Sequence, residues 1–398
     1  MEAPLKRAAR NANVAAFMTF AAFLGLGFAL PFLPLFVSEL GVKNPADAAQ
    51  WAGVLIGVGP LLAGLLAPFW GSQADRHGYK RVALIALSAL GVAQLVASVA
   101  QNPWHVMVSR VLSGLFGGVG PLGLAMASSA APRALGASKA IGKIQAAQIL
   151  AAGFGPLLGG TLASVFGIRI AFWGAALSCF LAVAIVGIFY EDEPRVEASE
   201  GPPAPMALLD LPAGFFAALV SVVFFVNFAS QSFTPILPAQ LAALDVSERA
   251  LAFSTGILIS VYSVAAALSS FGFGRLAARS DPARLLAISL GLSLVSALAM
   301  GYAPTFSIFL GLALVFGLVS GGSLTLGYSI GSRKFGEAAR GAFFGRLSGA
   351  ALIGGAVAPA IAASVARSSL PNVYWMNALV YAALIAVTIL ALRDRPRG

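Results

Sequence analysis

Residues 71–81, Gly-Ser-Gln-Ala-Asp-Arg-His-Gly-Tyr-Lys-Arg, form a short polar segment between two long apolar stretches at 51–74 and 82–101. The segment carries one carboxylate, Asp75, followed by several cations. Each neighbouring stretch has the length of about 20 residues that an α-helix needs to cross the hydrocarbon core of a bilayer. The segment therefore predicts a connection at a membrane surface, between two membrane-spanning helices.

The composition of the whole chain points the same way. Of its 398 residues, 59% are hydrophobic and 10% are charged, whereas about a quarter are charged in a typical soluble protein. A lipid-exposed backbone must satisfy its own hydrogen bonds, and the apolar stretches are too long and too uniform for barrel strands. We therefore predict an all-α polytopic membrane protein with twelve transmembrane helices. The apolar stretches lie near 13–38, 51–74, 82–101, 104–130, 141–166, 170–190, 212–241, 250–273, 285–303, 305–331, 342–366 and 373–392.

The positive charges predict an orientation. Most of the 25 Lys and Arg residues fall on one side of the membrane if the N-terminus is cytoplasmic. The positive-inside rule then predicts a multi-pass protein of the cell (inner) membrane with both termini in the cytoplasm. The net charge of +10 thus reflects topology, and we expect the lipid bilayer rather than nucleic acid as a partner. The first apolar stretch is about twice as long as the core of a signal peptide, so we predict a retained helix.

One segment differs in composition from the rest. Residues 191–210 are rich in acids and prolines and contain too little apolar surface to enter a bilayer or to pack as a domain. We predict a cytoplasmic linker there. It would separate an N-terminal six-helix bundle at 1–190 from a C-terminal six-helix bundle at 211–398.

The two halves share a pattern of glycines, cations and prolines. Because each half has an even number of helices, the repeat is parallel, and alternating-access transporters with this architecture bind substrate between the halves. A channel or a receptor would explain the hydrophobicity but not the repeat. At an offset of 203 residues, Gly71 pairs with Gly274, Arg76 with Arg279, Gly114 with Gly317 and Pro156 with Pro359.

Three local patterns resemble one family. Residues 71–81 resemble the G-x-x-x-D-R-x-G-x-[KR]-[KR] signature of the major facilitator superfamily. Arg110-Val-Leu-Ser-Gly114 is similar to its R-x-x-x-G pattern, and residues 155–160, Gly-Pro-Leu-Leu-Gly-Gly, resemble the G-P-x-x-G-G motif of its antiporters, with Ala151 where a further glycine is usual. The chain resembles above all the bacterial twelve-helix drug:proton antiporters. The resemblance implies two bundles related by a pseudo-twofold axis, with helices 1, 4, 7 and 10 around a central cavity, and protons as a coupled ion.

The signature residues are candidates for gating. A carboxylate among cations and near a helix N-terminus can form a latch that holds the helix ends together in one state. The alternative is a simple turn whose cations anchor the chain at the membrane surface. In the second half Ala278 stands where the aspartate would be, so a latch would be asymmetric. The candidates are Gly71, Asp75, Arg76, Gly78, Lys80 and Arg81.

The fifth stretch contains a second candidate for gating. Ala151, Gly155 and Gly159 recur every four residues on one helix face, where a neighbouring backbone can approach closely, and Pro156 interrupts the hydrogen-bond ladder. This pattern is compatible with tight packing or with gating. The resemblance to antiporters favours gating.

Proton coupling has fewer candidates. Arg110 lies about a third of the way into its span, where a cation costs about 2.5–3.5 kcal/mol. It would snorkel to the interface or, by the resemblance, take part in proton coupling. No Asp or Glu lies in the middle of a predicted span, and the nearest carboxylate, Glu39, follows a predicted kink at Pro31 and Pro34. Glu39 would face Arg110 or remain a solvated charge at a helix end.

Substrate contacts would come from uncharged polar residues within the spans. Such residues contact a ligand or form interhelical hydrogen bonds. With 28 phenylalanines in the chain, an aromatic cavity with a few amides suits lipophilic substrates. The candidates, together with Arg110, are Gln145, Gln148, Asn227, Gln231 and Tyr262.

We therefore predict a secondary active transporter, with proton-coupled efflux of lipophilic or amphipathic small molecules. The alternative is a sugar or other small-metabolite carrier of the same fold. An enzyme is not expected, because no nucleophile accompanies a base, and Cys179 stands alone. One cysteine and two histidines are also too few for a metal site of those ligands, so we predict no metal. We further predict no cofactor and a functional monomer.

Overall fold

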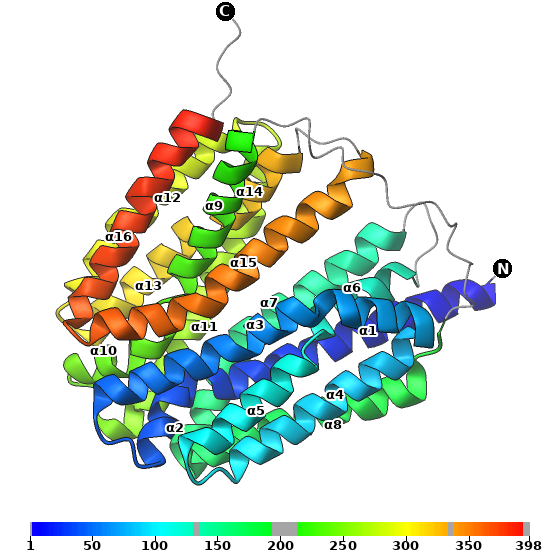
Figure 1. The fold of residues 1–398 in the computed structure, drawn as a ribbon, viewed down its shortest axis with the longest axis horizontal. Helices are drawn as coiled ribbons and strands as arrows, with labels where there is room; N and C mark the ends of the chain where they lie inside the picture. The colour runs from blue at the N-terminus through cyan, green and yellow to red at the C-terminus, as the bar shows by residue number, and fades with distance from the viewer. Residues whose placement is uncertain (1, 130–135, 193–212, 333–336, 393–398) are drawn as a thin grey trace, which may run out of the picture. The chain divides into compact units, whose positions relative to one another are not determined.

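The computed structural model describes residues 2–129, 136–192, 213–332 and 337–392. In these ranges the chain forms helices joined by short turns (Figure 1), as the all-α prediction requires. The chain divides into two compact units. The first contains Met1–Val196 together with Val246–Ser260, and the second contains Glu197–Asp245 with Val261–Gly398. The boundary predicted at 191–210 stays a prediction, since residues 193–212 lie outside the described ranges.

Eight α-helices and one 3-10 turn belong entirely to the described part of the first unit. The buried side chains between them are mostly Ala, Val, Leu and Phe, and they form two clusters, one near each end of the unit. The elements are α1 (Glu2–Ala29), η1 (Leu30–Phe32), α2 (Leu33–Glu39), α3 (Pro45–His77), α4 (Tyr79–Ser98), α5 (Pro103–Leu115), α6 (Val119–Ser129), α7 (Gly136–Phe166) and α8 (Ile168–Phe189).

The second unit repeats this order of elements. Helix α11 contributes its first part to the first unit and its remainder, from Val261, to the second. The elements are α9 (Ala213–Gln231), η2 (Thr234–Ile236), α10 (Leu237–Ala243), α11 (Glu248–Ala277), α12 (Pro282–Gly301), α13 (Phe306–Ser320), α14 (Ser323–Ser332), α15 (Glu337–Ala366), α16 (Leu370–Val387) and a π-helical end η3 (Thr388–Leu392).

Eleven helical segments of the described chain are long and apolar enough to cross a membrane. The twelfth predicted stretch, 104–130, is not a continuous helix, because it breaks between α5 and α6 at Phe116–Gly118. At this break, Gly117 packs so closely against α3 that a larger residue would not fit. A Cβ on Gly117 would lie 2.7 Å from the Cβ of Ala63. The indole Nε1 of Trp70 donates to the carbonyl of Leu115 at 2.6 Å, which satisfies an acceptor near the end of α5.

Prolines interrupt the first span of each unit. Pro31 lies in η1 and Pro34 is the second residue of α2, while Pro235 and Pro238 occupy the same places in η2 and α10. Proline lacks an amide hydrogen and clashes with the preceding turn, so the α-helix gives way to a short 3-10 turn. The kink predicted at Pro31 and Pro34 is confirmed.

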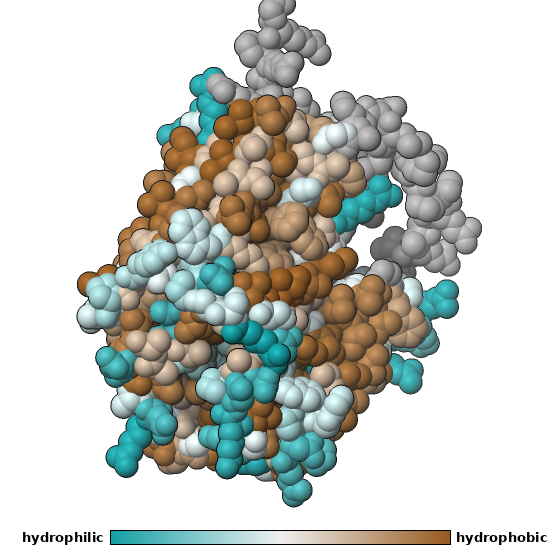
Figure 2. Space-filling view, turned by 60° about the vertical axis from the view of Figure 1, so that its left-hand side comes forward, coloured by the Kyte–Doolittle hydropathy of each residue, from teal (hydrophilic) through white to brown (hydrophobic). Residues whose placement is uncertain are grey.

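Large apolar side chains are exposed along the helices. On α8, Leu177 is 70% exposed and Ile188 is 71% exposed, and Leu379 on α16 is 69% exposed. Figure 2 shows broad apolar areas on the face it displays, with hydrophilic side chains gathered at the lower edge of the view. A soluble monomer rarely exposes apolar patches of this extent, whereas a surface in contact with lipid requires them.

Candidate transport and gating site

The connection at 71–81 is a tight turn between two helices. Helix α3 ends at His77, Gly78 has a φ of 92°, and α4 begins at Tyr79. A left-handed φ of this size favours glycine, because a Cβ would clash with the backbone. The glycine of the family signature therefore has a local structural reason in this chain.

The carboxylate of Asp192 lies directly against this turn. Its Oδ1 accepts a hydrogen bond from the backbone N–H of Lys80 at 3.0 Å, and so caps the N-terminus of α4. A Cβ on Gly78 would lie 2.6 Å from Oδ2 of the same carboxylate. Gly78 thus serves both the backbone turn and the space for the capping carboxylate. The sequence predicted that Asp192 belongs to a linker. No motif around it indicated a contact with Lys80, which lies 112 residues away in the sequence.

Glu191 and Asp192 also hold the beginning of α1. The Glu191 carboxylate forms salt bridges with Arg7 at 3.2 Å and Arg10 at 2.6 Å. Arg7 also donates to the Asp192 carbonyl at 2.6 Å, and the Asn11 amide donates to the Glu191 carbonyl at 2.8 Å. These contacts tie the start of α1, the turn after α3 and the segment that follows α8 into one cluster, which we call the α1–α4–α8 clamp.

The cations of the signature lie at or near the surface of the first unit. Arg76 and Arg81 are exposed, and Lys80 is half-buried. The side chain of Asp75 lies outside the described part, so the predicted latch stays a prediction.

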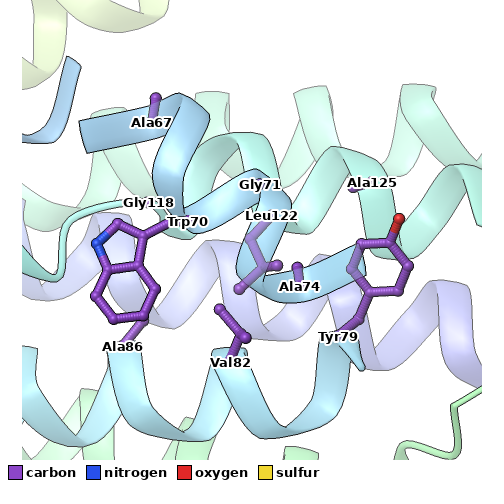
Figure 3. Close-up of a pocket in the computed structure, with 10 residues that line it drawn as sticks. All are labelled: Ala67, Trp70, Gly71, Ala74, Tyr79, Val82, Ala86, Gly118, Leu122 and Ala125. Carbon is purple, nitrogen blue, oxygen red and sulfur yellow. The ribbon is translucent and has the colours of Figure 1, made fainter. Parts of the chain in front are cut away.

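Gly71 borders a pocket of about 340 Å³ between α3, α4 and α6. Figure 3 shows Trp70 and Tyr79 at opposite ends of this pocket, with Leu122 and Val82 between them. A Cβ on Gly71 would meet no described atom within 4 Å. The first glycine of the signature therefore faces open space, in contrast to Gly78.

Arg110 is buried inside the first unit. Its side chain on α5 is 2% exposed, so it does not snorkel to the interface in this structure. Its Nη2 donates to Oε1 of Gln94 on α4 at 2.8 Å and to Oγ of Ser109 at 3.0 Å. Its Nε has no hydrogen-bond partner among the described residues. Two neutral oxygens thus accept hydrogen bonds from a buried cation. The sequence did not indicate Gln94 as a partner, because a single glutamine in an apolar stretch belongs to no recognisable motif.

Glu39 is exposed at the end of α2, where it interacts electrostatically with Arg169. Arg169 in turn donates to the carbonyls of Ser98 at 2.8 Å and Ala100 at 2.7 Å, and its guanidinium lies 5.4 Å from the ring centre of Phe36. Arg169 is therefore the cation whose charge acts on Glu39. The pairing of Glu39 with Arg110 that the sequence left open is not found.

The glycine motif of α7 forms a close helix contact. Ala151, Gly155 and Gly159 are all buried, and a Cβ on Gly159 would lie 2.6 Å from the Cα of Phe28 on α1. A Cβ on Gly155 would lie 3.0 Å from the Cα of Gly27. The small residues thus bring the backbones of α1 and α7 together, and this contact lies entirely within the first unit.

Pro156 and Gly160 of the same motif pack against the first part of α11, which belongs to the first unit. A Cβ on Gly160 would lie 2.7 Å from the Ala252 carbonyl oxygen, and a Cβ on Gly256 would meet the carbonyl of Pro156. The motif therefore serves two helix contacts at once. Packing is the observed role, and a role in gating stays a prediction.

Three of the predicted substrate residues lie in the second unit. Asn227 on α9 donates from its amide to the carbonyl of Ala351 on α15 at 2.6 Å, which is an interhelical hydrogen bond. Asn227 and Gln231 both face Gly355, since a Cβ on that glycine would lie 3.3 Å and 3.4 Å from their side chains. Tyr262 on α11 stacks on Phe316 with 5.7 Å between ring centres.

Gln145 and Gln148 belong to the first unit, on α7. Gln145 is exposed and Gln148 is half-buried. Their spacing of three residues places them on one face of α7, as predicted. Along the chain they precede Gly155 and Gly159, which form the close contact of the same helix with α1.

A buried polar contact of the second unit was not predicted. The amide of Asn377 on α16 donates to Oγ of Ser232 at 2.8 Å, at the point where α9 ends and the 3-10 turn begins. Next to it, Phe233 packs between Phe316 and Tyr374 at 5.5 Å and 5.4 Å between ring centres. This contact supports the interrupted span of the second unit from inside.

Comparisons with known proteins agree with this architecture. The chain is 33% identical over 298 residues to the multidrug resistance protein MdtG of Proteus mirabilis, which is 72% of this chain and 72% of that protein. It is 32% identical over 300 residues to the MdtG protein of Yersinia enterocolitica, covering 73% of this chain and 69% of that protein. A solved structure of the nucleoside transporter NupG is similar in fold, with a TM-score of 0.78, 13% identity and coverage of 96% of this chain and 100% of that chain.

The family profile described as Major Facilitator Superfamily matches residues 15–236 and 219–398. The two matches include the signature turn, the buried arginine, the glycine motif of α7 and the interrupted spans of both units. The chain belongs to the Major Facilitator Superfamily of secondary transporters.

Proposed function

We propose that this transporter exports lipophilic or amphipathic small molecules in exchange for protons. The observation that carries the proposal is the 33% identity, over 72% of the chain, to a protein named for multidrug resistance. The proposal includes an orientation with both termini in the cytoplasm, a location in the inner membrane of the cell and function as a monomer. The distribution of Lys and Arg supports this orientation.

The polar groups of the second unit support a lipophilic substrate. Tyr262 is only partly buried and its ring stacks on the buried Phe316, and Asn227 and Gln231 are uncharged amides on α9 of the same unit. Binding sites for lipophilic ligands combine apolar and aromatic walls with a few polar groups that set the orientation. A sugar would require more hydrogen-bonding side chains, because each buried hydroxyl needs a partner.

Proton coupling requires a group whose protonation changes during the transport cycle. The predicted spans contain no central Asp or Glu, so the proposal assigns coupling to Glu39 at the end of α2 and a supporting role to the buried cation Arg110. Moving one charge through the membrane potential is worth about 2.3 kcal/mol per 100 mV. A proton gains this energy only by crossing the whole membrane, so the proposal requires that Glu39 is reached from the two sides of the membrane in turn.

The direct test measures transport by the purified protein in sealed vesicles with an imposed pH gradient. A labelled lipophilic cation and a labelled sugar are compared, with protein-free vesicles and a proton ionophore as controls. We expect gradient-driven movement of the lipophilic compound, which the ionophore abolishes, and no movement of the sugar. Movement of the sugar instead would assign the chain to the small-metabolite carriers of the family.

Substitution of Glu39 tests the coupling. Glu39→Gln should abolish gradient-driven transport and spare substrate exchange, because exchange needs the conformational change but no net proton movement. Asp47→Asn in the first turn of α3 is the matched control at the same end of the spans, and it should behave as the wild type. Full gradient-driven transport in Glu39→Gln would show that this carboxylate does not couple protons.

A further inference from the structure

Arg169, in the first turn of α8, connects three elements of the first unit. Its Nη1 donates to the carbonyl of Ser98 at 2.8 Å, and its Nη2 donates to the carbonyl of Ala100 at 2.7 Å. Both carbonyls lie at or just after the end of α4, where backbone acceptors have no partner within the helix. The guanidinium also lies 5.4 Å from the ring centre of Phe36 on α2. The cation is therefore fixed where α2, α4 and α8 meet.

The packing of α2 against α8 brings Glu39 towards this cation. The rings of Phe36 and Phe172 are both buried, with 4.8 Å between their centres. Phe172 follows Arg169 by three residues on α8, and Glu39 follows Phe36 by three residues on α2. Residues three apart share a helix face, so the aromatic contact and the two charged residues lie on the faces that the helices turn to each other.

Two influences on the protonation of Glu39 oppose each other. The surrounding protein removes part of the water from Glu39, which favours the neutral acid, and the charge of Arg169 favours the carboxylate. Of the charged groups at this end of the first unit, Arg169 is the one whose charge acts on Glu39. The other titratable or charged groups that the structure describes there are Lys43 between α2 and α3, Asp47 on α3, His105 on α5, and Glu248 and Arg249 on α11.

Arg169 differs from the usual cation of a salt bridge. Its two terminal nitrogens donate to neutral backbone oxygens, and these bonds do not depend on the charge of Glu39. A cation held only by a carboxylate would be released when that carboxylate takes up a proton. Arg169 instead keeps its place in both protonation states of Glu39 and acts as a permanent positive charge.

We propose that Arg169 is the positioning residue of the proton site: fixed between α2 and α4, it sets the proton affinity of Glu39. This inference rests on the proposed coupling at Glu39 and adds the residue that tunes it. A fixed cation favours the ionised carboxylate, so Glu39 releases its proton at a lower pH than it would without Arg169.

The first test reads the protonation of Glu39 directly. The purified full-length protein in a neutral detergent is treated with a carbodiimide across a range of pH, and modification of the Glu39 peptide is quantified by mass spectrometry. Carbodiimides react with the protonated carboxyl, so labelling falls as the pH rises through the midpoint of Glu39. Arg169→Gln should move this midpoint upward by about 0.5 pH unit or more, since a cation nearby shifts a carboxyl by about 1–3 and exposure to water weakens the effect. An unchanged midpoint would overturn the proposal.

Two further variants separate charge from structure. Arg169→Lys keeps the positive charge, although one ammonium group does not reproduce the two fixed bonds of the guanidinium, so its midpoint should lie between those of the wild type and Arg169→Gln. Lys43→Gln removes an exposed cation four residues after Glu39 and should leave the midpoint close to that of the wild type. Equal shifts in Arg169→Lys and Arg169→Gln, or an equal shift in Lys43→Gln, would contradict a specific effect of the Arg169 charge.

A second measurement does not depend on the folding of an Arg169 variant. Glu39 and Arg169 are both exposed, so salt screens their attraction. The labelling midpoint of the wild type should therefore rise between low and high salt, and Lys43→Gln should retain this rise. A midpoint that does not respond to salt, or a response that Lys43→Gln abolishes, would exclude Arg169 as its cause.

Labelling and transport together distinguish this inference from the proposed function. Normal gradient-driven transport in Glu39→Gln, with a shifted midpoint in Arg169→Gln, would reject coupling at Glu39 and retain the effect of Arg169 on its proton affinity. Loss of gradient-driven transport in Glu39→Gln, with an unchanged midpoint in Arg169→Gln, would retain the coupling and reject the role of Arg169. If both hold, the pH profile of transport by Arg169→Gln should move upward with the labelling midpoint.

Discussion

At the scale of single residues, the family signature combines two kinds of glycine. Gly78 has a positive φ and a carboxylate where its Cβ would be, whereas Gly71 borders a pocket and has open space at the same position. The signature therefore contains one glycine that the local backbone requires and one that it tolerates. Only the first is explained by the structure of the turn.

Substitution by alanine separates the two positions. Gly78→Ala should lower the free energy of unfolding by about 1–2 kcal/mol or more, because the left-handed conformation is strained and the capping contact of Asp192 is displaced. Thermal unfolding in detergent provides the measurement. Gly71→Ala is the matched control within the same motif and should not destabilise the protein. Similar losses in both variants would contradict this interpretation of the turn.

The predicted latch depends on a third residue of the signature. Asp75→Asn keeps the size of the side chain and removes its charge, so the protein should fold and insert normally but turn over more slowly. Transport rates at matched expression test this expectation, with Asp47→Asn as a control of equal chemistry on the same helix. An unchanged rate in Asp75→Asn would remove the latch from the mechanism.

At the scale of the elements, close helix contacts require residues without side chains. On α7, Gly155 and Gly159 meet the backbone of α1 at Gly27 and Phe28, and the contact leaves no space for a Cβ. The same helix contains Gly142, where a Cβ would meet no described atom within 4 Å. Close packing therefore requires glycine at positions 155 and 159, whereas at position 142 packing imposes no such requirement and helix propensity alone matters.

This difference predicts opposite effects of the same substitution. Gly159→Ala should force α1 and α7 apart and cost about 1–3 kcal/mol of stability, as overpacking does in other cores. Gly142→Ala should be neutral or slightly stabilising, because alanine is a better helix former than glycine. Thermal unfolding and transport are measured for both variants. Destabilisation by Gly142→Ala, with none by Gly159→Ala, would refute the packing role.

At the scale of the whole molecule, the sequence repeat corresponds to a repeat of local structure. Each unit interrupts its first span with a 3-10 turn at a proline, divides its fourth span at a pair of glycines and carries a proline inside its fifth. The second pair of glycines, Gly321 and Gly322, lies between α13 and α14 as Gly117 and Gly118 lie between α5 and α6. Such agreement supports the parallel repeat.

A parallel repeat predicts that equivalent turns face the same side of the membrane. Single cysteines at positions 75 and 279, in a Cys179→Ser background, should both react with an impermeant thiol reagent from the same side. Cys179 is buried, so its replacement removes the only background thiol with little change at the surface. Labelling from opposite sides would show that the two halves are not related in this way.

The sequence alone determined where the chain enters lipid and where its helices bend. The apolar stretches, the kink at Pro31 and Pro34 and the turn at Gly78 follow from local rules, because each backbone group in lipid must find its partner within the segment. The break at Phe116–Gly118 was not predicted, and the close approach of Gly117 to Ala63 that accompanies it is seen only in the tertiary structure.

Tertiary structure decided which polar groups meet. Asp192 caps a helix that begins more than a hundred residues earlier, Arg110 donates a hydrogen bond to Gln94, and the charge that acts on Glu39 is that of Arg169. No local pattern encodes these pairs, because they depend on how helices pack against each other, and in a span almost any polar side chain can find a partner. Two side chains meet only if the packing of the helices brings them within reach, so Asp192, Gln94 and Arg169 were recognised as partners only in the tertiary structure.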